Sequence, residues 1–173
     1  MKPARRPSCA ARNIAYMKGM QLPKLVQVVC PHCDTTNRMP RERLADRGKC
    51  GACKRPLFEG HPIALDDAQR FAAHAAHNDI PLLVDFWAAW CGPCRAMAPA
   101  YADAAGTLEP EVRVAKVDSD ATPELAQRFG IRSIPTMILI HRDRELARIS
   151  GALSAPQILS WVRQSLAQAD TRS

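Results

Sequence analysis

The sequence lacks three features, and each absence argues against a class of protein. No apolar run reaches the roughly eighteen residues that a transmembrane helix needs, so no membrane span is predicted. Residues 1–19 contain no apolar stretch long enough for a secretory signal peptide. The same residues contain five basic side chains and no acid, so only +2 of the net charge of +7 belongs to the rest of the chain. Net charge alone therefore gives no reason to expect nucleic-acid binding.

The basic N-terminal segment, residues 1–23, is predicted to be a disordered tail or to lie outside the mature protein. Its composition changes abruptly at Gln21, which is compatible with a translation start at Met20. An arginine-rich, acid-free composition is also typical of a mitochondrial transit peptide, an alternative that we favour less. Cys9 lies in this segment, and nothing in the sequence assigns it a role.

Seven cysteines are present, but their spacing argues against a secreted disulfide scaffold. Six of them form three Cys-x-x-Cys pairs, and the chain is long enough to bury a core without disulfides. Such pairs in a chain without an export signal are typical of metal-binding and catalytic sites in a reducing cytosol. We therefore expect a cytoplasmic protein.

Two of the pairs, Cys30-Pro31-His32-Cys33 and Cys50-Gly51-Ala52-Cys53, are separated by sixteen residues. Two such knuckles can close a tetrahedron of thiolates around Zn²⁺, with iron as the second choice of metal. The predicted metal ligands are Cys30, Cys33, Cys50 and Cys53, and His32 is expected at the surface rather than as a fifth ligand. Cys-Pro-His-Cys is also a redox motif of strongly oxidising proteins, but here it does not lie between a strand and a long helix. No aromatic residue is interleaved with the nearby basic residues, so a nucleic-acid partner is not expected.

After the knuckles, the hydrophobic pattern alternates between helix and strand. Helices are predicted at about 66–77, 93–108, 122–129 and 155–168, and strands at about 82–88, 112–117, 136–141 and 145–150. This order indicates an α/β fold with a mixed central sheet and helices on both faces. A break at His61-Pro62 divides the chain into a small zinc-ribbon-like module at 24–60 and a larger domain at 62–170.

The third cysteine pair lies in Trp90-Cys91-Gly92-Pro93-Cys94, between a predicted strand and a predicted helix. At that junction the helix N–H groups and the positive helix end favour thiolate over thiol, and the thiolate is the reactive nucleophile. The pair is therefore predicted to be a dithiol redox centre. Asp85 lies in the otherwise apolar strand before it. Burial there would raise its pKa, as expected of a proton-transfer group, whereas the alternative is a side chain that faces water.

The motif and three later segments resemble the thioredoxin family. The segment Val84-Asp85-Phe86-Trp87-Ala88-Ala89-Trp90-Cys91-Gly92-Pro93-Cys94 is followed, in family order, by Val114-Ala115-Lys116-Val117-Asp118, Phe129-Gly130-Ile131-Arg132-Ser133-Ile134-Pro135-Thr136 and Ser150-Gly151-Ala152-Leu153. The resemblance covers roughly residues 62–168. It implies a thioredoxin fold and a protein-disulfide reductase, and in this family a Gly-Pro dipeptide between the cysteines goes with a reducing centre.

The resemblance also implies roles for individual residues. Cys91 would be the exposed nucleophile that attacks a substrate disulfide, and Cys94 would be the shielded thiol that resolves the mixed disulfide. Asp85 would lie beneath Cys94 as its proton acceptor, with Lys116 as its neighbour. Pro135 would be cis and packed against the cysteines. Together with Pro135, a flat apolar docking patch would include Trp90, Gly92, Pro93, Ile134, Gly151 and Ala152.

Four further side chains have plainer expectations. Trp87 and Trp161 are predicted to belong to the hydrophobic core. His74 and His77 lie three residues apart on a predicted helix, but no third metal ligand accompanies them, so both are expected at the surface.

The N-terminal module resembles the zinc domain that precedes the thioredoxin domain in the bacterial thioredoxin 2 group. This resemblance implies a monomer that reduces disulfide-containing proteins and is recharged by an NADPH-dependent thioredoxin reductase. Zn²⁺ would be structural or redox-sensing, and the redox step would need no cofactor of its own. The alternatives are a zinc-linked redox sensor, whose thiolates oxidise and release the metal, and a zinc-ribbon adaptor.

Overall fold

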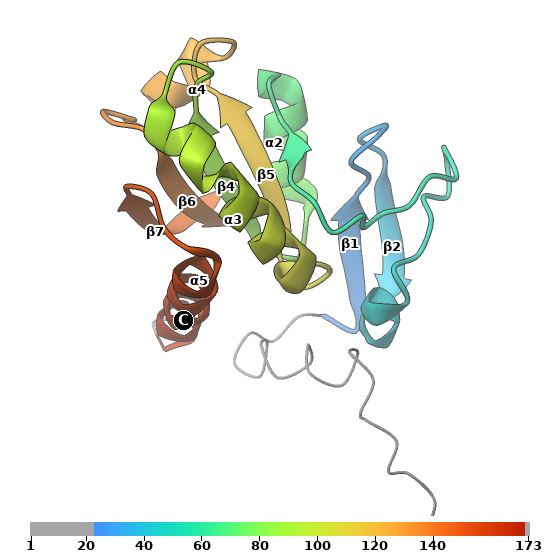
Figure 1. The fold of residues 1–173 in the computed structure, drawn as a ribbon. Coiled ribbons are helices and arrows are strands. Elements are labelled where there is room, and N and C mark those ends of the chain that lie inside the picture. Colours follow the sequence, from blue (N-terminus) through green and yellow to red (C-terminus); the bar gives the residue numbers. More distant parts are fainter. Residues whose placement is uncertain (1–22, 172–173) are drawn as a thin grey trace, which may run out of the picture.

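The structure is a computed structural model that describes residues 23–171 of the 173-residue chain. A two-stranded sheet lies beside a five-stranded sheet that carries helices on both faces (Figure 1). Apart from Pro23, the predicted basic tail lies outside the described residues, and so does Cys9. None of the helices within residues 23–171 has the length and apolar character that a membrane span requires.

The N-terminal module is built on a hairpin of β1 (Leu25–Val29) and β2 (Thr36–Pro40). The two strands pair antiparallel, and the first cysteine knuckle forms the turn between them. The short 3₁₀ helix η2 (Arg41–Asp46) follows, and the second knuckle comes after it. The sequence pattern predicts none of these elements, because such short segments show no clear periodicity.

The large sheet has the strand order β3-β5-β4-β6-β7. β3 (Ile63–Ala64), β5 (Arg113–Asp118) and β4 (Leu82–Trp87) run parallel, whereas β6 (Thr136–His141) and β7 (Arg144–Ser150) are added in antiparallel pairing. β4 is therefore the central strand, which explains its continuous apolar sequence. The strand that leads to the dithiol motif is anchored on both sides.

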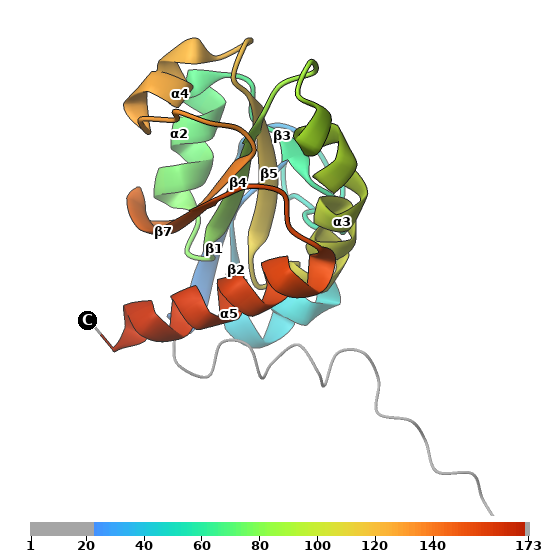
Figure 2. The same ribbon diagram turned by 60° about the vertical axis from the view of Figure 1, so that its left-hand side comes forward.

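Helices cover both faces of this sheet (Figure 2). α3 (Gly92–Leu108) and α5 (Ala155–Asp170) pack on one face, and α2 (Ala68–His77) and α4 (Pro123–Arg128) pack on the other. The predicted mixed sheet with helices on both faces is confirmed, and every predicted helix and strand is present with its ends within two residues. Only β3 is missing from the prediction for this domain, because a strand of two residues is too short to show an alternating hydrophobic pattern.

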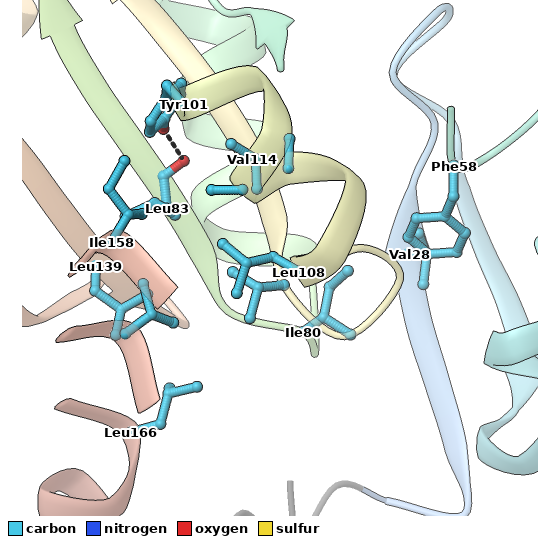
Figure 3. Packing of buried hydrophobic residues seen from close by; sticks show 14 of the residues in the cluster. Val28, Phe58, Ile80, Leu83, Tyr101, Leu108, Val114, Leu139, Ile158 and Leu166 are labelled. Carbon is cyan, nitrogen blue, oxygen red and sulfur yellow. Dashed lines mark hydrogen bonds between the residues drawn. The ribbon is translucent and has the colours of Figure 1, made fainter. Parts of the chain in front are cut away.

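The larger hydrophobic cluster extends across the α3 face of the sheet and into the N-terminal module, residues 24–60, which we call the ribbon. Figure 3 shows Leu83, Val114 and Leu139 from the sheet beside Leu108 and Ile158 from the helices. The same cluster takes in apolar side chains of the ribbon: Val26, Val28, Leu44, Leu57 and Phe58. The ribbon and the large sheet therefore share one core rather than meeting through a polar linker.

A fully buried ion pair lies where the two parts meet. Arg113 Nη1 donates to Glu109 Oε1 at 2.5 Å, and neither side chain is exposed. Arg113 Nη2 also donates to the backbone carbonyl of Leu57 at 2.7 Å, and its guanidinium stacks over the Phe58 ring at 4.7 Å. The other oxygen of Glu109 accepts the backbone N–H of Gly60 at 2.8 Å. Both charged side chains of the larger domain are thus bound partly by groups of the ribbon.

The surface prediction for His74 is wrong, although His77 is exposed as expected. His74 is fully buried because the knuckle residue Asp34 packs over α2, with Oδ1 3.3 Å from His74 Nε2. Arg70, one turn earlier on α2, donates from Nε to both oxygens of Asp34 at 2.9 and 3.1 Å. Asn78 completes the contact by accepting the backbone N–H of Val29 at 2.8 Å.

Candidate functional site

The dithiol lies at the start of α3, directly after the loop that follows the central strand β4. Cys91 is the N-cap residue of α3, and its sulfur accepts the backbone N–H of Cys94 at 3.2 Å. Pro93 occupies the first turn, where its missing N–H has no helical partner to lose. A thiolate at Cys91 would therefore be stabilised by a helix N–H group and by the positive end of the helix.

The two cysteines are joined as a disulfide, so the structure shows the oxidised form. Cys91 is 4% exposed and Cys94 is completely buried. Cys91 is the more accessible of the two, but the expectation of an openly exposed sulfur is wrong, because the helix start and the Ile134 segment cover it. Cys91 Sγ lies 3.8 Å from the carbonyl oxygen of Ile134.

Asp85 lies on β4 with its side chain 1% exposed. Neither carboxylate oxygen has a hydrogen-bond partner among residues 23–171. Burial raises the pKa of Asp85 to about 7, although the nearby positive charge of Lys116 lowers it somewhat. The predicted burial is confirmed, and the alternative of a carboxylate facing water is excluded. Lys116 lies directly opposite Asp85 on the parallel strand β5.

Sequence reasoning missed two side chains near Asp85. The core prediction for Trp87 is wrong: the residue is half-buried and belongs to neither hydrophobic cluster. Lys116 Nζ lies 4.2 Å from the centre of its ring. Tyr101 of α3 is fully buried, and its hydroxyl contacts the carbonyl oxygens of Ala115 at 2.7 Å and Leu83 at 3.2 Å. The spacing of Trp87 from Asp85 was the available signal, since residues two apart on a strand share a face.

Pro135 follows a cis peptide bond from Ile134, as expected, and it is buried beside the start of β6. Its carbonyl oxygen accepts the backbone N–H of Gly151 at 2.9 Å, which brings the end of β7 to the same region. Ile134 is half-buried, and Gly151 and Ala152 are exposed. The cis-proline turn thus contacts both the dithiol and the Gly151-Ala152 segment of the predicted docking patch.

Trp90 is the most exposed large apolar side chain of the described residues, at 68%. Its indole N–H donates to Asp120 Oδ2 at 2.9 Å, which fixes the orientation of the ring. Gly92 and Pro93 are exposed beside it. The structure thus leaves an aromatic surface and a small-residue surface uncovered next to Cys91. Trp161, by contrast, packs against the larger core as predicted.

The four ribbon cysteines meet at one point, with their sulfur atoms all within 4.8 Å of one another. The distances are 3.6 Å for Cys30 to Cys53 and 3.7 Å for Cys33 to Cys50. A tetrahedral zinc site with Zn–S bonds of about 2.3 Å places its sulfurs about 3.8 Å apart, so this donor set fits Zn²⁺. His32 is partly buried and its Nε2 lies 3.5 Å from Glu59, so it is neither a ligand nor fully at the surface.

Comparisons with known proteins agree with both parts of this description. A family model described as "Thioredoxin" matches residues 62–164, and one described as "Thioredoxin 2, N-terminal" matches residues 29–55. The first match covers the dithiol and the cis-proline turn, and the second covers all four clustered cysteines.

Individual relatives and solved structures give the same result. Thioredoxin C-3 of Corynebacterium nephridii is 43% identical over 141 residues, which cover 82% of this chain and 96% of that protein. The bifunctional thioredoxin reductase/thioredoxin of Mycobacterium leprae (strain TN) is 43% identical over 100 residues, which cover 58% of this chain and 22% of that protein. A thioredoxin structure from Nicotiana alata matches with a TM-score of 0.54 at 29% identity, over 61% of this chain and 92% of that chain. By its motifs, its fold and these relatives, the chain belongs to the thioredoxin family of thiol-disulfide oxidoreductases.

Proposed function

We propose that the protein is a cytoplasmic protein-disulfide reductase that uses the Cys91/Cys94 dithiol. The observation that carries the proposal is the position of Cys91. Its sulfur accepts a helix N–H group, and an exposed Trp90 and the carbonyl of Ile134 lie around it. This arrangement supports a stabilised thiolate beside a surface on which an extended, partly apolar segment can dock.

The redox step transfers two electrons to the substrate. The Cys91 thiolate attacks one sulfur of the substrate disulfide, which forms a mixed disulfide and releases the other sulfur as a thiolate. The Cys94 thiol loses its proton, and its thiolate attacks Cys91 Sγ. The Cys91–Cys94 disulfide forms, and the second substrate sulfur leaves as a thiolate. Protonation of the two substrate thiolates completes the reaction.

Asp85 is the proton acceptor that we assign to Cys94. Its burial raises its pKa to about 7, so it can take up a proton near neutral pH, whereas an ordinary aspartate would stay ionised. Its unpartnered oxygens are free to bind such a proton or a bridging water. Pro135, with no N–H and a buried ring, shapes the wall beside the disulfide.

A thioredoxin reductase that uses NADPH would recharge the protein. The bifunctional relative in Mycobacterium leprae, whose name joins a reductase to a thioredoxin, supports this pairing. The partners would be that reductase and disulfide-containing proteins, and we expect a monomer with no nucleic-acid or membrane partner. We assign the ribbon to residues 24–60 and the redox domain to residues 62–170.

Zn²⁺ would be held by the four ribbon thiolates, where it would supply a structural cross-link to a module whose apolar side chains belong to the core shared with the larger domain. A zinc-linked redox sensor is the second candidate function, since Cys33 is exposed and accessible to oxidants. Zinc release by peroxide that changes reductase activity would favour the sensor. Zinc release that changes only stability would favour a structural site. The intact Cys91/Cys94 dithiol argues against a zinc-ribbon adaptor, which would not need it.

The test follows NADPH consumption with thioredoxin reductase and insulin as the disulfide substrate. Wild type should turn over, and both Cys91→Ser and Cys94→Ser should abolish turnover. The two variants provide matched controls, because only Cys94→Ser should accumulate a mixed disulfide with the substrate on a non-reducing gel. Trapping by Cys91→Ser instead, or an inactive wild type with free thiols, would contradict the proposal.

A further inference from the structure

Asp85, Trp87 and Lys116 share one face of the sheet. Asp85 and Trp87 lie two residues apart on β4, so both point to the α3 side, as does their neighbour Leu83 in the core beneath α3. Lys116 lies opposite Asp85 in the register of β4 and β5. The ammonium group is therefore within reach of both the carboxyl group and the indole ring.

Of these two partners, Lys116 contacts the ring. Its Nζ lies 4.2 Å from the centre of the Trp87 ring. Asp85 has no hydrogen bond to either oxygen and no ion pair with Lys116 among the described residues. The pair thus remains separated even though cross-strand register places the two residues side by side, and the aromatic face is the group that holds the cation.

The other groups that face Asp85 offer no competing positive charge. On α3, burial and the charge of Asp85 raise the pKa of the Tyr101 hydroxyl. Cys94 on the same helix is part of the disulfide. On β6, the residue paired with Asp85 is Met137. Asp118, opposite Trp87 on β5, accepts the backbone N–H groups of Asp120 and Ala121. Lys116 is therefore the cation that lowers the pKa of Asp85.

We propose that Trp87 is a positioning residue for the redox step: its ring holds the Lys116 ammonium and prevents it from closing onto Asp85, which leaves the carboxylate able to accept a proton from Cys94. This inference rests on the proposed role of Asp85. If the ammonium moved onto the carboxylate, it would stabilise the ionised form and make Asp85 a weaker base. The ring therefore preserves the basicity that burial creates.

The experiment measures the titration of Asp85 by ¹³C NMR of its carboxyl carbon in the oxidised, zinc-loaded protein. Trp87→Leu keeps apolar bulk but removes the aromatic face, so Lys116 should pair with Asp85 and lower its proton affinity about three- to tenfold. Trp87→Phe, which keeps a ring, should give a smaller decrease in the same direction, and it serves if the leucine variant does not fold. Trp161→Leu is the matched control, because it removes a core tryptophan that does not contact Lys116.

A double-mutant cycle with Lys116→Met identifies the route of the effect. In the Lys116→Met background, Trp87→Leu should leave the Asp85 titration unchanged, because no ammonium remains to move. An unchanged or raised proton affinity in the Trp87→Leu single variant would overturn the inference. So would a decrease that persists without Lys116, since it would come from packing alone.

The pH profile of insulin reduction separates this inference from the proposed function. If Trp87 acts through Asp85, the acidic limb of the profile should move to lower pH by the same three- to tenfold change in proton concentration. A shifted NMR titration with an unmoved profile would show that Asp85 is not the proton acceptor, and Trp87 would then have no role in the redox step. An inactive wild type would overturn the reductase proposal itself and would leave the NMR result unaffected.

Discussion

Replacing Arg113 by methionine tests whether the buried ion pair holds the ribbon and the redox domain together. Methionine keeps the apolar stem but removes the guanidinium, so Glu109 is left as a buried carboxylate with the Gly60 N–H as its remaining donor. The carbonyl oxygen of Leu57 also loses its donor. Removing one partner of a buried pair typically destabilises a protein by about 3–5 kcal/mol, and Arg113→Met should fall in that range.

Two further variants define how the effect arises. Arg113→Met combined with Glu109→Gln removes the unpaired charge, so the double variant should be clearly more stable than the single one. Arg128 forms an ion pair with Asp143, and the two side chains are 47% and 50% exposed. Arg128→Met breaks this exposed pair and should lower the free energy of unfolding by less than about 1 kcal/mol. Both Arg113→Met and Arg128→Met remove an arginine, so the expected difference in stability comes from the burial of the Arg113 ion pair.

Urea unfolding of the zinc-loaded proteins, followed by circular dichroism, provides the free energies. Zinc content is measured for each variant, so that loss of metal is not mistaken for loss of the ion pair. An Arg113→Met protein within about 1 kcal/mol of wild type, with its zinc retained, would refute the assignment of Glu109 as a buried charge that depends on this partner. A double variant no more stable than the single one would refute it equally.

Three other predictions concern the proton acceptor, the ribbon contact and the metal. Burial raises the pKa of Asp85 to about 7, whereas an aspartate in the unfolded chain ionises near pH 4. The folded wild-type protein therefore loses stability as pH rises from about 4 to about 7. Asp85→Asn should therefore gain about 3–5 kcal/mol over wild type at pH 8 relative to pH 4, measured by urea unfolding of the oxidised proteins. Asn78→Ala leaves the buried Val29 N–H without its acceptor and should cost about 1–3 kcal/mol in the same assay, whereas an unchanged midpoint would contradict the contact. Cys50→Ser should reduce bound zinc well below one ion per chain and lower the unfolding midpoint, and full zinc occupancy in elemental analysis would contradict a four-thiolate site.

Much of the redox domain is predictable because its elements are long and periodic. β4 is apolar throughout because it is central, and the amphipathic pattern of α5 places Ile158 and Val162 on the core side. The ribbon strands are not predictable in this way. They are short, and metal ligands and contacts with the larger domain determine their positions more than periodicity does.

The candidate site shows the same division between local and tertiary information. The positions of Cys91, Cys94 and Pro135 follow from motifs that are contiguous in the sequence. The burial of His74 does not, because it depends on Asp34, which lies 40 residues earlier in the chain. The contact of Lys116 with Trp87 depends on the register between two parallel strands, and no short segment contains both.

The contacts between the ribbon and the redox domain have a consequence for how the ribbon sequence can change. Arg113 donates to the carbonyl of Leu57, Arg70 donates to the carbonyl of Pro31, and Glu109 accepts the N–H of Gly60. All three ribbon partners are main-chain atoms, which substitution of their own side chains does not remove. A chimera that carries another ribbon of the same backbone shape should therefore dock on this domain if it keeps the Asp34 carboxylate and the apolar side chains of the shared core. Changes at Arg70, Glu109 or Arg113 would disrupt docking of any ribbon.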